Sequence, residues 1–154
     1  MKKILIAQDY DPSSQKIAEA GFSIAQSMNA GITLLHVISD DLYYSSIPFS
    51  PYMGFVGYKD VEVENLSNIE LTEAPTRFLE FAKKHLRDEN IEILIKEGDF
   101  ADSILEGALS INADMIVIGS HSRSKLSELL IGSVTEKVLR HTTIPLLIIP
   151  VKNK

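Results

Sequence analysis

The sequence predicts an α/β fold in which helices cover both faces of an open, five-stranded parallel sheet, a Rossmann-like architecture. Five short apolar runs occur along the 154 residues, and longer stretches separate them. Several of these stretches carry apolar residues at helical spacing, and strands that alternate with helices form parallel sheets. The chain length favours one domain, residues 1–154, with a full core.

The five expected strands are short runs rich in Ile, Leu and Val, as buried strands of a parallel sheet are. They cover residues 3–7, 32–38, 91–96, 113–118 and 146–149. The third run partly alternates isoleucine with charged residues, so we expect that strand to lie nearer solvent.

Four helices are expected between and after these strands, at about 12–29, 65–90, 99–109 and 134–139. Asp11 is expected to cap the first of them, with Pro12 at its first position. Pro75 should kink the second helix or mark its true start, because proline interrupts a helix interior. The third helix should begin at Gly98-Asp99.

Residues 39–64 break this pattern and form an aromatic-rich insertion. Six of the eleven aromatic residues lie between 43 and 58, with prolines and glycines among them. A loop of this length in a compact domain is a lid, an interface or a disordered segment. A loop folded back over the core is the simpler alternative.

Composition excludes several classes of function. Cysteine is absent, so there is no disulfide framework or thiolate chemistry. The net charge of −6 argues against a nucleic-acid partner. The apolar start of the chain is too short for a signal peptide or a membrane span, so we expect a cytoplasmic protein with no membrane partner. The four histidines lack metal-ligand spacing, and no metal site is predicted.

The stretch 119–133 carries the strongest functional signal. It follows an expected strand with Gly119-Ser120, continues as a polar loop and ends in Gly132-Ser133 at an expected helix start. Amide N–H groups at a helix start attract anions, and glycine allows a ligand close to the backbone. This pattern predicts a phosphate cradle, and therefore a nucleotide-binding site.

These motifs resemble those of the universal stress protein family, and the resemblance covers nearly the whole chain. The nucleotide-binding branch of that family carries Gly, two residues, Gly, nine residues, then Gly-Ser or Gly-Thr. Here the pattern reads Gly119, two residues, Ser122, nine residues and Gly132-Ser133. The segments 4–9, 35–37 and 113–119 are also similar to the family's strands.

The resemblance implies an adenine nucleotide alpha hydrolase-like fold with an ATP site, with or without Mg²⁺, at the carboxyl ends of the strands. The position matching Asp9 faces ribose or phosphates in the family, and the position matching Val37 contacts adenine. The other implied site residues are Ala7, Ile118, Gly119, His121, Ser122, Arg123, Gly132, Ser133, Val134 and Thr135.

Two departures from the family pattern affect this site. Ser122 replaces the second loop glycine, and a positive φ there would cost serine about 1–2 kcal/mol. That cost would weaken binding about 10- to 30-fold without abolishing it. Tyr10-Asp11 replaces the usual Gly-Ser after the first-strand acid, and Asp11 adds a negative charge unless it is turned away by its capping role.

Each candidate residue also has a simpler interpretation. Asp9 can cap the loop that leads to Pro12, and Arg123 can be a solvated loop charge instead of a phosphate contact. His36 is expected to be a hydrogen-bonded core histidine, and Asp114 to have a structural role. No residue is placed to orient a water for phosphoryl transfer, so we assign no catalytic residue and expect hydrolysis to be slow at most.

The resemblance and the apolar run 146–151 together predict a homodimer, in which family members pair this last strand across a two-fold axis. The leading hypothesis is a dimeric, ATP-binding stress-response sensor or regulator whose nucleotide occupancy is read by an unknown protein partner. One alternative is an interaction protein that binds no nucleotide and uses residues 43–58. The other is a slow ATPase on the same scaffold.

Overall fold

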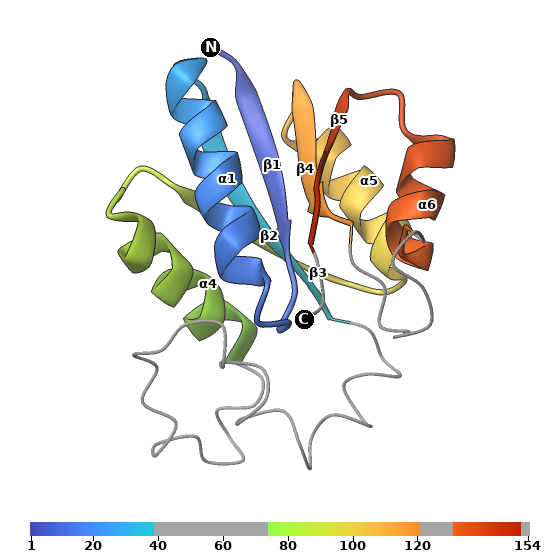
Figure 1. Ribbon diagram of the computed structural model, residues 1–154, viewed down its shortest axis with the longest axis horizontal. Helices are drawn as coiled ribbons and strands as arrows, with labels where there is room; N and C mark the ends of the chain where they lie inside the picture. The colour runs from blue at the N-terminus through green and yellow to red at the C-terminus, as the bar shows by residue number, and fades with distance from the viewer. Residues whose placement is uncertain (39–73, 121–130, 152–154) are drawn as a thin grey trace.

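The computed structural model describes residues 1–38, 74–120 and 131–151. Along these residues the elements are β1 (Lys3–Gln8), α1 (Ser14–Ser27), β2 (Gly31–Ile38), α4 (Ala74–Leu86), β3 (Glu92–Glu97), α5 (Phe100–Ser110), β4 (Met115–Gly119), α6 (Ser133–His141) and β5 (Leu146–Ile149). The five strands form one parallel sheet in the order β3-β2-β1-β4-β5 (Figure 1). The predicted five-stranded, Rossmann-like sheet is therefore confirmed.

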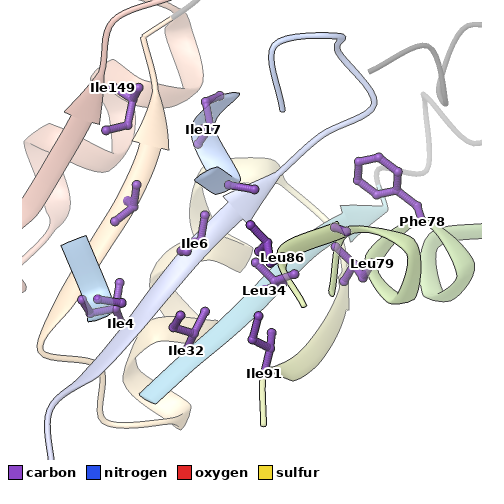
Figure 2. Close-up of a cluster of buried hydrophobic side chains, with 14 of the residues drawn as sticks. Ile4, Ile6, Ile17, Ile32, Leu34, Phe78, Leu79, Leu86, Ile91 and Ile149 are labelled. Atoms are coloured by element: carbon purple, nitrogen blue, oxygen red, sulfur yellow. The ribbon is translucent and has the colours of Figure 1, made fainter. Parts of the chain in front are cut away.

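Helices α1 and α4 cover one face of the sheet, and α5 and α6 cover the other (Figure 1). Successive side chains of a strand point to opposite faces, so each strand contributes to two cores. In β1, Ile4 and Ile6 pack in the core beneath α1 and α4 (Figure 2), whereas Leu5 packs in the core beneath α5 and α6. This alternation continues to the ends of the strands, where it decides which side chains can face a ligand.

Helix α1 begins later than the sequence predicts. The prediction that Asp11 caps it and Pro12 occupies its first position is wrong, because the cap residue is Ser13. The Asp11 carboxylate instead accepts hydrogen bonds from the backbone N–H and the Oγ of Ser13, at 2.9 and 2.6 Å. An aspartate that bonds to the backbone two residues ahead forms an Asx-turn, and this turn delays the helix until Ser14.

The other helices lie where the sequence places them. Helix α4 occupies 74–86 of the expected 65–90, with Pro75 near its beginning, and residues 65–73 lie outside the described part of the chain. The Asp99 side chain caps α5 by accepting the Asp102 N–H at 3.0 Å. Among the described residues, no helix is long and apolar enough to cross a bilayer. The aromatic segment 43–58 also lies outside the described ranges.

The strand order creates a reversal point beside β1. The chain proceeds from β1 to β2 and β3 on one side, and then returns to place β4 and β5 on the other side. In open α/β sheets, ligands bind in the crevice outside the carboxyl ends of the strands at such a point. The fold therefore positions a candidate site at the ends of β1 and β4.

Candidate functional site

A pocket of about 520 Å³ opens at this position, at the carboxyl ends of β1, β2 and β4. The first turns of α5 and α6 form its other walls. Its described lining consists of Ala7, Gln8, Asp9, Ile17, Leu35, Val37, Phe100, Ile104, Ile118, Gly119, Ile131, Gly132, Ser133, Val134, Thr135 and Glu136. A pocket of this size, with few polar groups on apolar walls, is typical of small-molecule sites.

One end of the pocket is apolar. Leu35 and Val37 of β2 alternate with His36, so both face the side of the sheet that α5 covers. Phe100 and Ile104 stand one helical turn apart at the start of α5 and close this end of the pocket from above the sheet. An aromatic base could be buried between these two walls.

The other end of the pocket is formed by the start of α6. Gly132 is the N-cap residue, with an extended backbone (φ −60°, ψ 153°), and it has no side chain to cap the helix. The first hydrogen bond of the helix joins the Glu136 N–H to the Gly132 carbonyl at 2.9 Å. The preceding N–H groups of 133–135 have no intrahelical acceptor. Three amides and the helix dipole therefore make this end suitable for an anion.

The Thr135 hydroxyl is used to hold α6 in place. Only the backbone N–H of Thr135 is therefore left to bind a ligand. Thr135 is 2% exposed, and its Oγ1 donates to the Gly119 carbonyl at 2.8 Å. The Gly132 N–H donates to the Ser120 carbonyl at 3.2 Å. These bonds fix the first turn of α6 against the end of β4.

Asp9 both lines the pocket and organises the loop after β1. Its Oδ1 accepts hydrogen bonds from the Asp11 N–H at 3.0 Å and from the Ser14 Oγ at 2.8 Å. The two interpretations of Asp9, a ligand-facing acid and a loop cap, are therefore compatible in one side chain.

A charged bridge joins the two helices that flank the pocket. The Lys137 ammonium of α6 lies 3.0 Å from a carboxylate oxygen of Asp99 and 3.3 Å from one of Asp102, both at the start of α5. The Asp102 N–H and then Lys137 lower the pKa of the Asp99 carboxyl. All three side chains are exposed to solvent, so the bridge contributes little to stability.

Of the twelve site residues implied by the family resemblance, nine lie together in this pocket: Ala7, Asp9, Val37, Ile118, Gly119, Gly132, Ser133, Val134 and Thr135. The other three, His121, Ser122 and Arg123, lie outside the described residues. The sequence interpretation missed Phe100 and Ile104. The sequence does carry a signal for them: an apolar pair at helical spacing directly follows the Asp99 cap of a helix that begins at the carboxyl edge of the sheet.

Position 119 has no room for a side chain unless Ile17 of α1 shifts. A Cβ atom at Gly119 would lie 2.4 Å from Cδ1 and 3.3 Å from Cγ1 of Ile17 in α1. The reason is the strand alternation, which turns Ile118 toward α5 and α6 and position 119 toward α1.

We therefore expect Gly119→Ala to lower the free energy of unfolding by about 1–3 kcal/mol, the usual cost of overpacking a core. Ile17→Val removes the clashing Cδ1, so the double variant should recover part of that loss. Urea denaturation of the wild type, the two single variants and the double variant measures the coupling energy between positions 119 and 17. Strictly additive losses would contradict this assignment.

His36 is the hydrogen-bonded core histidine that the sequence predicts. It is 5% exposed, its Nδ1 lies 2.9 Å from the Gln8 carbonyl oxygen, and its ring contacts those of Tyr10 and Phe78. Burial lowers the pKa of His36, against the opposing effects of the Gln8 carbonyl and the Asp9 charge. The neutral ring donates from Nδ1 to Gln8 and so ties the ends of β1 and β2 together.

This burial predicts a pH dependence of stability. Because the folded-state pKa lies below the unfolded value of about 6.5, the unfolded chain binds the extra proton as the pH falls. The stabilisation is complete above pH 6.5 and is lost below it, with a slope of up to about 1.4 kcal/mol per pH unit. Urea denaturation between pH 7.5 and 5.5 should show this slope in the wild type and a flatter profile in His36→Gln. Parallel profiles would refute the assignment.

Comparisons with known proteins agree with this architecture. The model of the universal stress protein family matches residues 1–150. A universal stress protein of Methanocaldococcus jannaschii is 33% identical over 157 residues, which cover 99% of this chain and 96% of that protein. The stress response protein NhaX of Bacillus subtilis is 30% identical over 162 residues, with 96% of each chain covered.

Solved structures give the same result. The structure of the Methanocaldococcus jannaschii protein superposes with a TM-score of 0.71 at 27% identity, covering 99% of this chain and 98% of that one. A universal stress protein solved in complex with cAMP superposes with a TM-score of 0.64 at 19% identity, with 98% of each chain covered. The chain described here belongs to the universal stress protein family.

Proposed function

We propose that this chain binds an adenine nucleotide, ATP, in the pocket at the carboxyl ends of β1, β2 and β4, and that occupancy is read by a protein partner in a stress response. One observation carries the proposal: the uncapped start of α6 opens into one end of a pocket whose other end is apolar. A base and a phosphate chain need these two environments in one cavity. The family member solved with cAMP supports a nucleotide as the ligand.

The sheet order suggests how such a ligand would lie. Strand β1 stands between β2, whose Val37 belongs to the apolar end, and β4, whose end adjoins α6. Neighbouring strands are about 4.8 Å apart, so β2 to β4 spans about 10 Å. With the base against Val37 and the phosphates at the amides of 133–135, the ribose would lie over the end of β1, beside Asp9.

The pocket lining contains acidic side chains, which favour a phosphate chain whose own negative charge is partly neutralised by a cation. Asp9 and Glu136 are both in its lining, and Glu136 forms an ion pair with Arg140 at 2.8 Å. Mg²⁺ on the phosphates would reduce their repulsion from Asp9. We therefore propose the magnesium complex of ATP as the bound form.

The experiment is a calorimetric titration of purified protein with ATP and Mg²⁺. We expect saturable binding with one site per chain, and release of co-purified nucleotide on denaturation is a second sign. An absence of saturable binding up to millimolar ATP would contradict the proposal. That result would favour an interaction protein that uses residues 43–58.

We also propose that the chain forms a homodimer through residues 146–151. Strand β5 lies at an edge of the sheet, and Leu146, Leu147 and Ile148 remain partly exposed there. An apolar edge strand is stabilised when a second chain covers it. Light scattering should give the mass of two chains, and Leu147→Lys should give one. A wild-type monomer at high concentration would exclude this interface.

A further inference from the structure

Ser14, the first residue of α1, is 0% exposed. Buried hydroxyl groups in native proteins are hydrogen-bonded. Within the described part of the chain, all the hydrogen bonds of the Ser14 hydroxyl are made with Asp9. A side chain from the start of one helix is thus committed to a single residue of the pocket wall.

Three atoms of Asp9 surround this hydroxyl. Ser14 Oγ accepts the Asp9 N–H at 3.2 Å, and it lies 2.8 Å from Oδ1 and 2.5 Å from the carbonyl oxygen of Asp9. A hydroxyl has one proton and donates to only one of these two oxygens at a time. The Asp11 N–H donates to the same Oδ1 at 3.0 Å. When the hydroxyl proton is directed at Oδ1, two donors converge on this carboxylate oxygen and hold the side chain in one orientation.

An orientation fixed in this way matters for recognition of a hydroxyl group. Asp9 stands at the end of β1, between the apolar end of the pocket and the start of α6. A carboxylate that is already ordered pays less side-chain entropy when it accepts a ligand's hydroxyl, and such a charge-assisted bond is strong. Ser14 itself is not among the described lining residues, so it can act only through Asp9.

We infer that Ser14 is a positioning residue that holds the Asp9 carboxylate ready for the hydroxyl groups of a ribose, and that it thereby gives the site its preference for ribonucleotides over 2′-deoxyribonucleotides. The inference rests on the proposed nucleotide site and specifies its substrate class. The observation that supports the inference is the contact between the fully buried Ser14 hydroxyl and the Asp9 carboxylate that lines the pocket.

The test compares ATP and 2′-deoxy-ATP, each with Mg²⁺, in calorimetric titrations of wild type, Ser14→Ala and Ser13→Ala. We expect the wild type to prefer ATP at least about tenfold, the lower end of what one hydrogen bond to a charged group contributes. Ser14→Ala should weaken ATP binding about five- to tenfold and 2′-deoxy-ATP binding about twofold or less, so the preference nearly disappears. Ser13→Ala is the matched control, because the Ser13 hydroxyl bonds to Asp11, and it should keep the preference.

A merely structural role of Ser14 would weaken both nucleotides equally and leave their ratio unchanged, which would overturn the inference. If the wild type binds neither nucleotide, the proposed function itself fails and the inference fails with it. Ser14→Cys keeps nearly the size of the side chain but has only a weak donor, and it should lose the same preference, which keeps the test decisive if Ser14→Ala does not fold. Where Ser14→Ala folds, Asp9→Asn should also lose the preference, and adding Ser14→Ala to Asp9→Asn should change the ratio no further.

Discussion

Replacing Gly132 with aspartate should weaken ATP binding at least about 100-fold without destabilising the fold. Gly132 caps α6 in an extended conformation (φ −60°, ψ 153°) that any residue can adopt. Aspartate is a good N-cap, so the free energy of unfolding should be unchanged or higher by a few tenths of a kcal/mol. The same carboxylate would occupy the amides of 133–135 and repel a phosphate, at about 4 kcal/mol for unit charges 4 Å apart near a surface.

Gly132→Asn is the matched control for this effect. Asparagine has nearly the same shape and also caps helices, but it carries no charge. We expect it to weaken ATP binding about tenfold, the loss of one or two amide contacts, and adenosine binding little in either variant. Calorimetric titration with ATP and with adenosine separates the contribution of the phosphates to binding from that of the nucleoside. Equal losses in the two variants would show that the charge at the helix start is not what the ligand recognises.

Phe78→Ala should cost about 3–5 kcal/mol of the free energy of unfolding, the usual loss for truncating a buried phenylalanine. Phe78 is 1% exposed and packs edge-on against the rings of Tyr10 and His36, with centroid distances of 5.0 and 5.8 Å. It thereby joins α4 to the ends of β1 and β2 within the core beneath α1 and α4 (Figure 2). A domain of this size has a total stability of about 5–15 kcal/mol, so the loss is a large fraction of it.

Phe81→Ala is a suitable comparison, because Phe81 lies on the same helix and is only partly buried against this core. Its truncation should cost clearly less, since less apolar area returns to water. Urea denaturation at pH 7.5 measures both variants. Similar losses at the two positions would contradict the central place given to the Tyr10, His36 and Phe78 cluster.

The strands were predictable from the sequence because a buried parallel strand is a continuous apolar run. The run 32–38 predicts β2 to within one residue of its observed bounds, Gly31–Ile38. The start of α1 was less predictable. Asp11 and Pro12 fit a helix start by propensity, but the Asp11 carboxylate bonds to Ser13 in a turn. Local propensity does not reveal which of two competing hydrogen-bond partners wins.

The sequence predicted one end of the candidate site, at the start of α6, but only part of the other, apolar end. The α6 end follows from glycine and serine at a strand–loop–helix junction, which is a local pattern. The apolar end depends on Phe100 and Ile104, which meet Val37 only because the sheet order brings α5 over β2. Likewise, nothing local shows that Gly119 is packed against Ile17. Contacts set by topology between distant segments are the part that sequence reasoning missed.

The proposed site depends on main-chain amides at the start of α6 that bind the phosphates of an adenine nucleotide. The most direct measurement is a ¹⁵N NMR titration of the labelled protein with ATP and Mg²⁺, and separately with adenosine. With ATP, the amide resonances of Ser133, Val134 and Thr135 should shift saturably, together with that of Val37. With adenosine, Val37 should shift and the three amides of α6 should not. Saturable ATP binding that leaves the amide resonances of 133–135 unshifted would contradict a phosphate site at the start of α6.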